Sequence, residues 1–277
     1  LHPNRGIRLK VVDVARDCNR YDSRYRGVLR TMTGDSDLEV TSMASVELAR
    51  LGERLPSSVL GKIKSYLLNA RGMTAQVTTI LYAISAMGQD GVDIYRVLTD
   101  HSSSRMRTVA WQRLMGLTSG WKDPSLWLSA MKDKDKGVRE AVLNNLRGRV
   151  GVLNLEQMRV LVTSTYSDVR IFAGQCLMTA SDESVQEFGF ELLIDENEVV
   201  RSTTIRAMGV RKSPGWLKVM ARSLLDDHYA VQRAAMESLI TDRKDGVPVL
   251  LEHVAKYPTN QINSLVKAEL QKMGFQP

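Results

Sequence analysis

The sequence predicts an all-α fold, a superhelical solenoid of about seven or eight repeats that each contain two short helices. Three observations carry this prediction. A segment of 31 residues recurs four times without a gap, its apolar residues fall at helical spacing, and aromatic residues make up only 6% of the chain. A low aromatic content suits stacked repeats, because Leu, Val, Ala and Met can fill the thin interfaces between short helices.

Four regular copies form the centre of the chain, at residues 124–241. Their second halves read KGVREAVLNNLRG, SDVRIFAGQCLMT, EVVRSTTIRAMGV and YAVQRAAMESLIT, with one valine column: Val138, Val169, Val200 and Val231. In the first copy, Ala141, Val142 and Leu146 share the valine's helical face. The first halves are also apolar at helical spacing. Each copy therefore predicts two helices, A and then B, and neither can bury its apolar face without a neighbouring copy.

Looser copies flank the regular ones. RMRTVAWQRLMGL from Arg105, TAQVTTILYAISAMG from Thr74 and LEVTSMASVELARLG from Leu38 have the pattern of earlier B helices with altered spacing. Residues 242–277 form a closing helix pair in the same interpretation. We expect a single domain over residues 1–277, with a basic N-terminal cap and first repeat at 1–55 and a C-terminal cap at 242–277, because atypical end units commonly cap such arrays.

The turn between the A and B helices has a column of its own. In three of the four copies, an aspartate lies six residues before the arginine (Gln232 in the last copy) that follows the column valine. Ser164 takes the place of this aspartate in the other copy. A carboxylate in the turn and an arginine on helix B can pair within a repeat or between neighbouring repeats. We interpret this column as a structural ladder; the alternative that its arginines face a ligand stays open. The ladder residues are Asp133, Arg139, Arg170, Asp195, Arg201 and Asp226.

These features resemble the HEAT-repeat family, in particular its short, PBS-lyase-type repeats of about thirty residues. The matching pattern is Asp, then Val-Arg with the arginine six residues on, then a small residue, then Leu, and it covers residues 124–241 best. The resemblance implies a helical solenoid that binds partners on an extended surface.

The positive charge lies mostly at the start of the chain. The net charge is +7, and residues 1–34 contain eight basic and three acidic residues, so they account for five of these charges. This basic N-terminal segment is a candidate for contact with phosphate or another anionic surface. The alternative is an amphipathic capping helix whose outer face is simply solvated. Its candidate residues are Arg16, Arg20, Arg24, Arg26 and Arg30.

The sequence predicts no catalytic residue, no cofactor and no metal site. None of the four histidines pairs with another His or a Cys at ligand spacing, and Cys18 and Cys176 have the character of ordinary buried thiols. No phosphate-binding loop and no nucleophile elbow is present. No apolar run is long enough to span a membrane, and no signal peptide opens the chain.

We therefore expect a non-catalytic scaffold that binds a protein or peptide on a concave surface lined by B helices. Nucleic acid is the alternative partner, and basic residues on B helices could serve it. The candidate partner-binding residues are Arg113, Arg147, Arg149, Arg206, Arg211 and Arg243.

Two further alternatives stay open. HEAT-like alkylpurine DNA glycosylases hold a damaged base with tryptophans and an aspartate, and this chain has those residue types close together in sequence, although no motif matches. They are Trp111, Trp121, Trp127, Asp123, Asp133 and Asp135. Phycobilin lyases also share short HEAT repeats, without a motif that carries over. The chain could instead form one part of a larger multidomain or membrane-associated assembly.

Overall fold

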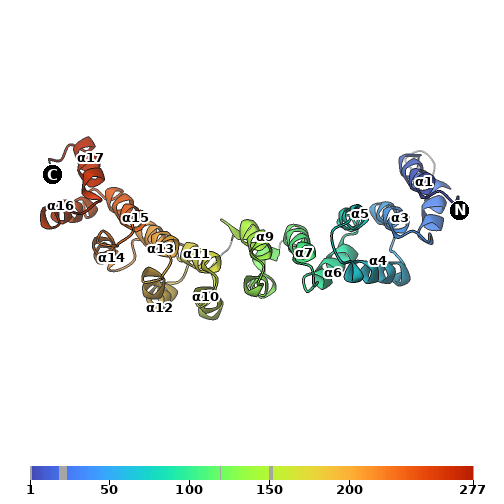
Figure 1. The fold of residues 1–277 in the computed structure, drawn as a ribbon, viewed down its shortest axis with the longest axis horizontal. Coiled ribbons are helices and arrows are strands. Elements are labelled where there is room, and N and C mark those ends of the chain that lie inside the picture. The colour runs from blue at the N-terminus through green and yellow to red at the C-terminus, as the bar shows by residue number, and fades with distance from the viewer. Residues whose placement is uncertain (1, 19–23, 119, 150–151, 277) are drawn as a thin grey trace. The chain divides into compact units, whose positions relative to one another are not determined.

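The computed structural model describes residues 2–118, 120–149 and 152–276, apart from residues 19–23. In this part of the chain every regular element is a helix, seventeen α-helices and two short 3-10 helices, and the predicted all-α fold is confirmed (Figure 1). The chain divides into two compact units, Leu1–Asn145 (unit 1) and Leu146–Pro277 (unit 2). Each unit is a series of helix pairs with its own core. The expectation of one continuous domain stays a prediction.

Unit 1 contains nine helices in the described residues, and its B helices α1, α3 and α5 lie side by side. The A helix before α9 is broken: α8 is short and lies between 3-10 helices at Gly120–Lys122 and Ala130–Lys132. The bounds are α1 (Arg5–Cys18), α2 (Arg24–Met32), α3 (Leu38–Arg50), α4 (Ser57–Asn69), α5 (Ala75–Ile84), α6 (Gln89–Leu98), α7 (Ser104–Leu117), α8 (Pro124–Trp127) and α9 (Lys136–Leu146).

Unit 2 holds the most regular helix pairs, in which the A helices α10, α12, α14 and α16 each precede a B helix. The sequence explains several helix starts, because Asn154, Ser181 and Asn197 accept hydrogen bonds from backbone N–H groups of the first turn. The bounds are α10 (Leu155–Val162), α11 (Ser167–Cys176), α12 (Asp182–Leu193), α13 (Glu198–Arg211), α14 (Trp216–Ser223), α15 (Tyr229–Ile240), α16 (Gly246–Lys256) and α17 (Asn263–Lys272).

The apolar columns of the repeat form the cores of both units. Val138 in unit 1 and Val169, Val200 and Val231 in unit 2 are all at most 1% exposed. The later column is buried as well: Leu146, Leu177, Met208 and Leu239. Helical spacing in the sequence thus identified the face of each B helix that packs inward.

The B helices of unit 2 approach one another closely. The helix α13 packs along both α11 and α15, and the contact points carry glycines. A Cβ atom on Gly209 would lie 2.5 Å from the Cβ of Ser238, and one on Gly174 would lie 2.9 Å from the Oγ1 of Thr204. Such distances leave no room for a methyl group, so glycine is what permits this spacing.

The A helices of unit 2 form a looser row. The helix α10 packs against α12, and α14 packs against α16, but α12 and α14 separate from one another (Figure 1). The row of A helices is therefore interrupted between α12 and α14, although the B helices of the same repeats stay in close contact.

Candidate functional site

In unit 2 the arginines of the ladder connect consecutive turns. The guanidinium of Arg170 donates from Nε and Nη2 to Oδ2 and Oδ1 of Asp195, at 2.6 and 3.1 Å. Arg201 binds Asp226 in the same two-point way, at 2.9 and 2.8 Å. Their Nη1 atoms donate to the carbonyl oxygens of Ser164 and Asp195, which lie six residues earlier. Each arginine therefore joins the turn before its own helix to the next turn along the chain.

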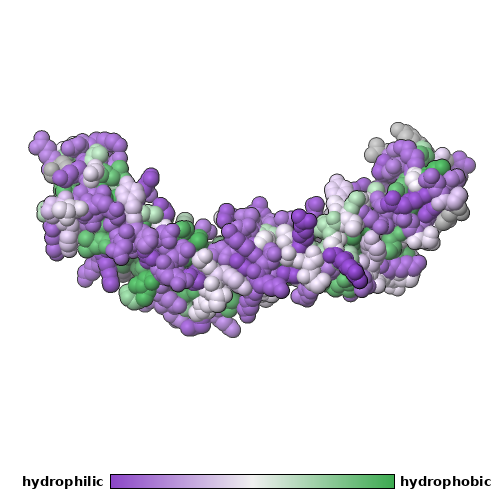
Figure 2. All heavy atoms as spheres, in the orientation of Figure 1, coloured by the Kyte–Doolittle hydropathy of each residue, from purple (hydrophilic) through white to green (hydrophobic). Residues whose placement is uncertain are grey.

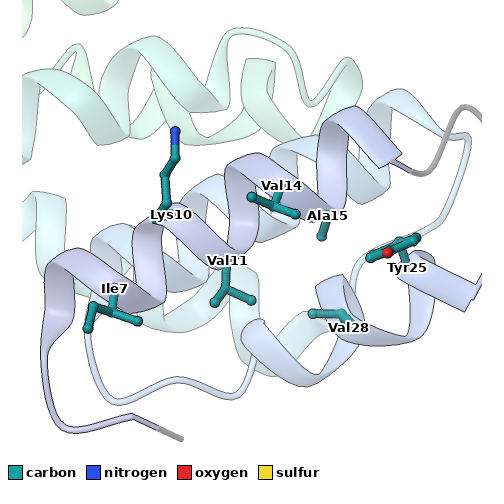
Figure 3. A pocket seen from close by; sticks show the side chains of 7 residues that line it. All are labelled: Ile7, Lys10, Val11, Val14, Ala15, Tyr25 and Val28. Carbon is teal, nitrogen blue, oxygen red and sulfur yellow. The ribbon is translucent and has the colours of Figure 1, made fainter.

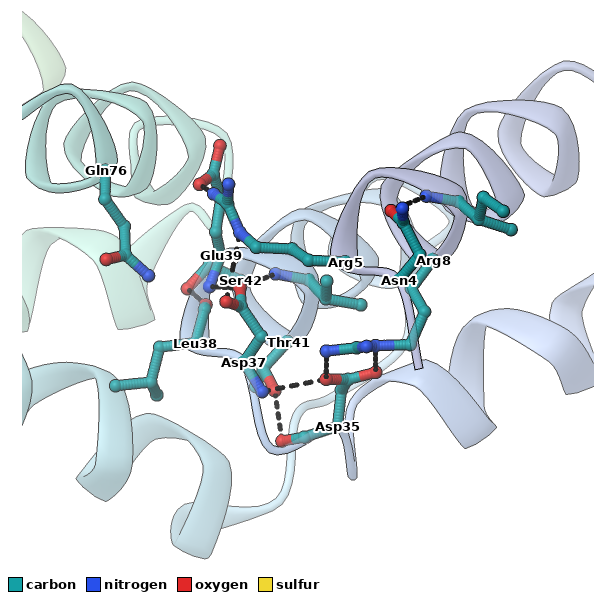
Figure 4. Close-up of polar contacts among 12 residues, drawn as sticks. Asn4, Arg5, Arg8, Asp35, Asp37, Leu38, Glu39, Thr41, Ser42 and Gln76 are labelled. Atoms are coloured by element: carbon teal, nitrogen blue, oxygen red, sulfur yellow. Dashed lines mark hydrogen bonds and ion pairs between the residues drawn. The ribbon is translucent and has the colours of Figure 1, made fainter. Parts of the chain in front are cut away.

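Unit 1 repeats this arrangement at two places that the sequence analysis did not assign. Arg107 binds Asp133 at 2.7 and 2.9 Å and donates to the carbonyl of His101. At the start of the chain, Arg8 binds Asp35 at 2.9 and 3.2 Å and donates to the carbonyl of His2 (Figure 4). In both places a histidine occupies the position six residues before the arginine, where the repeat pattern has an aspartate. The sequence pattern therefore did not identify these two arginines. The 25–27-residue interval from each arginine to the next turn aspartate could have found both.

Arg139 and Gln232, the first and last members of the predicted column, also bind a carbonyl oxygen of the turn before their own helix. Arg139 donates from Nη1 to the carbonyl oxygen of Asp133 at 2.8 Å. Gln232 donates to the carbonyl oxygen of Asp226 at 2.6 Å. The carbonyl contact within a repeat is thus kept where glutamine replaces the arginine.

Asp133 and Asp226 keep their charge because hydrogen bonds from arginine and backbone N–H groups outweigh the effect of burial on their pKa values. Burial acts to raise the pKa of Asp226, but the hydrogen bonds from Arg201 and from the backbone N–H of His228 lower it below the ordinary value. The same balance lowers the pKa of Asp133, with Arg107 as the main donor. The hydrogen bond to Asp226 likewise raises the pKa of Arg201. We propose that these pairs are structural, since both partners are nearly buried and already engaged.

The basic N-terminal segment is largely neutralised by carboxylates of unit 1. Arg16 pairs with Asp13 and Asp17, while Arg26 and Arg30 share Glu53. Arg5 contacts Asp37 and Glu39 at the start of α3 (Figure 4). Arg24 also has an interaction partner, and Arg20 lies outside the described residues. Contact of this segment with an anionic surface stays a prediction, and most of its described charges are already engaged within the unit.

The helix α1 occupies the position of a B helix, because Arg8 makes the ladder contacts that mark B helices elsewhere. The face of α1 next to α2 is partly open. A hollow of about 310 Å³ lies there (Figure 3). We call it the N-terminal groove; its lining includes Ile7, Val11, Val14, Tyr25 and Val28. Ile7 and Val14 are each 45% exposed, so an apolar surface accompanies the basic residues of this segment.

The candidate partner-binding arginines lie on several elements. Arg113 is exposed on α7, Arg147 and Arg149 are exposed in the turn after α9, and Arg243 is exposed after α15. On α13, Arg206 lies 3.7 Å from Glu237, and Arg211 contacts Asp182 and the carbonyl oxygen of Ala180. Their role in binding stays a prediction.

The tryptophans of unit 1 fill its interior. Trp111 is 4% exposed and Trp127 is fully buried, whereas the side chain of Trp121 lies outside the described residues. Asp133 is held by Arg107, and Asp123 accepts hydrogen bonds from Ser125 at the start of α8. The described tryptophans and carboxylates therefore do not line an open base-binding pocket together.

Metal and membrane chemistry find no support in the described residues. They contain no group of His, Cys, Asp and Glu side chains that could hold a metal ion. None of their helices combines the length and apolar composition of a membrane-spanning helix. The buried thiol of Cys176 has its pKa raised to about 12 by burial, which keeps it protonated and unreactive at neutral pH.

A larger hollow lies where the A helices of unit 2 separate, with a volume of about 790 Å³. We call it the α12–α14 groove. It is bordered by large apolar side chains that are unusually exposed: Phe190 and Ile194 at 59% each and Leu225 at 42%. Figure 2 shows an apolar patch over these helices. Lys218, Val219 and Arg222 of α14 also line the groove. The sequence analysis missed this groove, although Phe190 and Ile194 lie four residues apart, outside the buried stripe of α12.

The comparison with family models agrees with the repeat pattern. Residues 156–241 match the model described as HEAT repeats. This segment of the chain therefore has the pattern of HEAT repeats. The resemblance inferred from the turn column is thereby confirmed, and the HEAT-repeat match includes α12, α13 and α14, which surround the groove. A search of curated proteins finds no match.

Several solved structures are similar to this chain. Escherichia coli YibA is 16% identical, with 94% of this chain and 96% of that chain covered and a TM-score of 0.49. Human deoxyhypusine hydroxylase in complex with glycerol is 14% identical, with 84% and 96% covered and a TM-score of 0.35. The complex of CpcE and CpcF of phycocyanin lyase from Nostoc is 15% identical, with 90% and 94% covered and a TM-score of 0.23. What these proteins bind or catalyse is not carried over to this chain.

Proposed function

We propose that the protein is a non-catalytic scaffold that binds a protein or peptide partner. The observation that carries the proposal is the α12–α14 groove, a hollow of about 790 Å³ whose walls expose Phe190, Ile194 and Leu225. Contiguous exposed apolar side chains around a hollow are typical of interaction sites on otherwise soluble proteins. HEAT repeats provide the rigid frame, because the Arg–Asp ladder and the closely packed B helices hold neighbouring pairs together.

The groove differs from the site that the sequence favoured. The sequence-based expectation placed the partner on the B helices, and α13 does expose Val199 and Val210, while Met178 is exposed just after α11. The groove lies among the A helices and combines exposed apolar side chains with a hollow that could enclose part of a ligand. We therefore place the primary site in the groove and keep the B-helix surface as the second site to test.

Photo-crosslinking tests the proposal with a matched control. A photoreactive phenylalanine analogue replaces Phe190 in the full chain, which is expressed in the cells that normally make it. The control carries the same analogue at Tyr82 of α5, an aromatic side chain that is 67% exposed in unit 1. We expect a discrete crosslinked protein from position 190 that is absent from position 82. Identical patterns from the two positions would contradict the proposal.

A further inference from the structure

The two walls of the α12–α14 groove have different chemistry. Phe190 lies in the last turn of α12, and Ile194, four residues on, is the C-cap whose N–H donates to the carbonyl oxygen of Phe190. The two side chains therefore lie at the same end of α12 and both line the groove. On α14, Lys218 and Arg222 also lie four residues apart and are both exposed. Val219 and Leu225 add apolar surface on the α14 side. The groove thus presents an apolar wall opposite a wall that carries two cations.

Lys218 and Arg222 differ from the two ladder arginines near the groove in having no ion-pair partner among the described residues. Arg201 is bound to Asp226, and Arg170 is bound to Asp195, at the base of the groove. Lys218 and Arg222 form no ion pair among the residues that the structure describes, and the segment Trp216–Ser223 contains no acidic residue. Of the groove's carboxylates, Glu196 contacts Arg170, and Asp227 lies in the turn after α14.

Two like charges one helical turn apart repel one another and destabilise an isolated helix by a few tenths of a kcal/mol. A bound carboxylate would offset this repulsion, and partial removal of water by a ligand would strengthen the attraction. The apolar wall fits the apolar face of a helix, whose anchor residues recur every three or four positions. The groove's chemistry therefore matches a ligand with one apolar face and one acidic face.

We propose that the α12–α14 groove binds an amphipathic helix with an acidic polar face. The helix lies along the groove with its apolar side chains against Phe190 and Ile194 and its carboxylates near Lys218 and Arg222. This inference rests on the proposed function, because it names the partner class of the same groove. A basic helix would bring like charges together, and nucleic acid would leave the apolar wall unused.

Three designed helical peptides with identical apolar positions test this proposal. Their polar positions carry Glu, Gln or Lys, and fluorescence anisotropy measures their binding to the full chain at low salt. We expect the Glu peptide to bind most tightly and the Lys peptide about tenfold more weakly, because two exposed charge contacts change from attraction to repulsion. Added salt reduces the difference, since exposed charges are screened.

Two groups of variants locate the site. The double reversal K218E/R222E should invert the order of the Glu and Lys peptides. The matched reversal K62E/K64E changes two exposed cations of α4 in unit 1 and should leave the order unchanged. Phe190→Ser should weaken all three peptides, whereas Tyr82→Ser, at a 67% exposed position of α5, should weaken none. Circular dichroism confirms that each variant keeps its helix content.

The outcomes separate this inference from the proposed function. Equal or tighter binding of the Lys peptide would overturn the acidic partner and leave an apolar docking groove. Unchanged binding to Phe190→Ser would overturn the location. Failure of all three peptides would overturn the helix as ligand, while a crosslinked protein from position 190 would still support the scaffold. Preference for the Glu peptide, inverted only by K218E/R222E, would support the inference.

Discussion

The two rows of helices in unit 2 come from the same repeats and pack very differently. The B helices α11, α13 and α15 touch through small residues, and the turns that precede them are tied by arginine–aspartate pairs. The A-helix row opens between α12 and α14, where Phe190 of α12 is 59% exposed. One row thus holds the repeats together while the other leaves room for a ligand. The A helix of a repeat can therefore vary while the packing of the B helices is kept.

The largest expected effect is loss of a ladder arginine. Arg201→Ala removes the two contacts to Asp226 and the one to Asp195, and it leaves a carboxylate that is only 17% exposed without its cation. We expect the free energy of unfolding to fall by about 3 kcal/mol. Urea unfolding followed by circular dichroism measures the change.

Arg206→Ala is the matched control on the same helix. Its side chain is 51% exposed and lies 3.7 Å from Glu237, so the expected loss is below about 0.5 kcal/mol. Equal losses from Arg201→Ala and Arg206→Ala would mean that the ladder does not stabilise the repeats.

The next prediction compares the stability effect of replacing a glycine in the B-helix row with that of replacing one in the A-helix row. Gly209→Ala places a Cβ 2.5 Å from the Cβ of Ser238 and forces α13 and α15 apart, at a cost of about 2 kcal/mol. Gly189→Ala on α12 meets nothing nearer than 3.7 Å and should stabilise the helix by about 0.5 kcal/mol, because alanine has the higher helix propensity. Thermal unfolding midpoints compare the two variants. Shifts in the same direction would show that the rows are packed alike.

A smaller effect on stability is expected when the pH is lowered. The pKa of Asp226 is lower in the folded chain than the ordinary value of about 3.9. Its charge therefore stabilises the fold above that value, and the contribution is lost as the pH falls through the folded-state pKa. We expect Asp226→Asn to be about 1 kcal/mol less stable than the wild type at neutral pH and to approach it at low pH. Urea midpoints between neutral pH and pH values below about 3.9 test this; parallel curves would be inconsistent with it.

The smallest effect on stability belongs to the A row. Phe190→Ser and Ile194→Ser change side chains that are 59% exposed, so the unfolding free energy should change by less than about 0.5 kcal/mol. Binding to the groove should nevertheless be lost. A large loss of stability in either variant would mean that these side chains belong to the core and that the groove is a packing feature.

Sequence reasoning succeeded where the relevant signal is local. The spacing of Val138, Ala141 and Leu146 identified a helix and its inner face, and all three are buried. The turn column identified residues that do form ion pairs. It missed Arg8, because His2 replaces the aspartate in the preceding turn and the earlier spacing has drifted. It also missed the groove, because the contact between two A helices depends on side-chain volumes that no periodicity records.

By itself, the sequence determined the helix pairs, their 31-residue period in the centre and the faces that pack inward, since helical periodicity and turn chemistry act over a few residues. The tertiary structure decided which aspartate each arginine reaches. Arg201 binds the carboxylate of Asp226 and only the backbone carbonyl of Asp195. It also decided that α12 and α14 separate while α13 and α15 stay close. Both outcomes depend on how side chains about 25 to 31 residues apart fit together, which is a property of packed volumes.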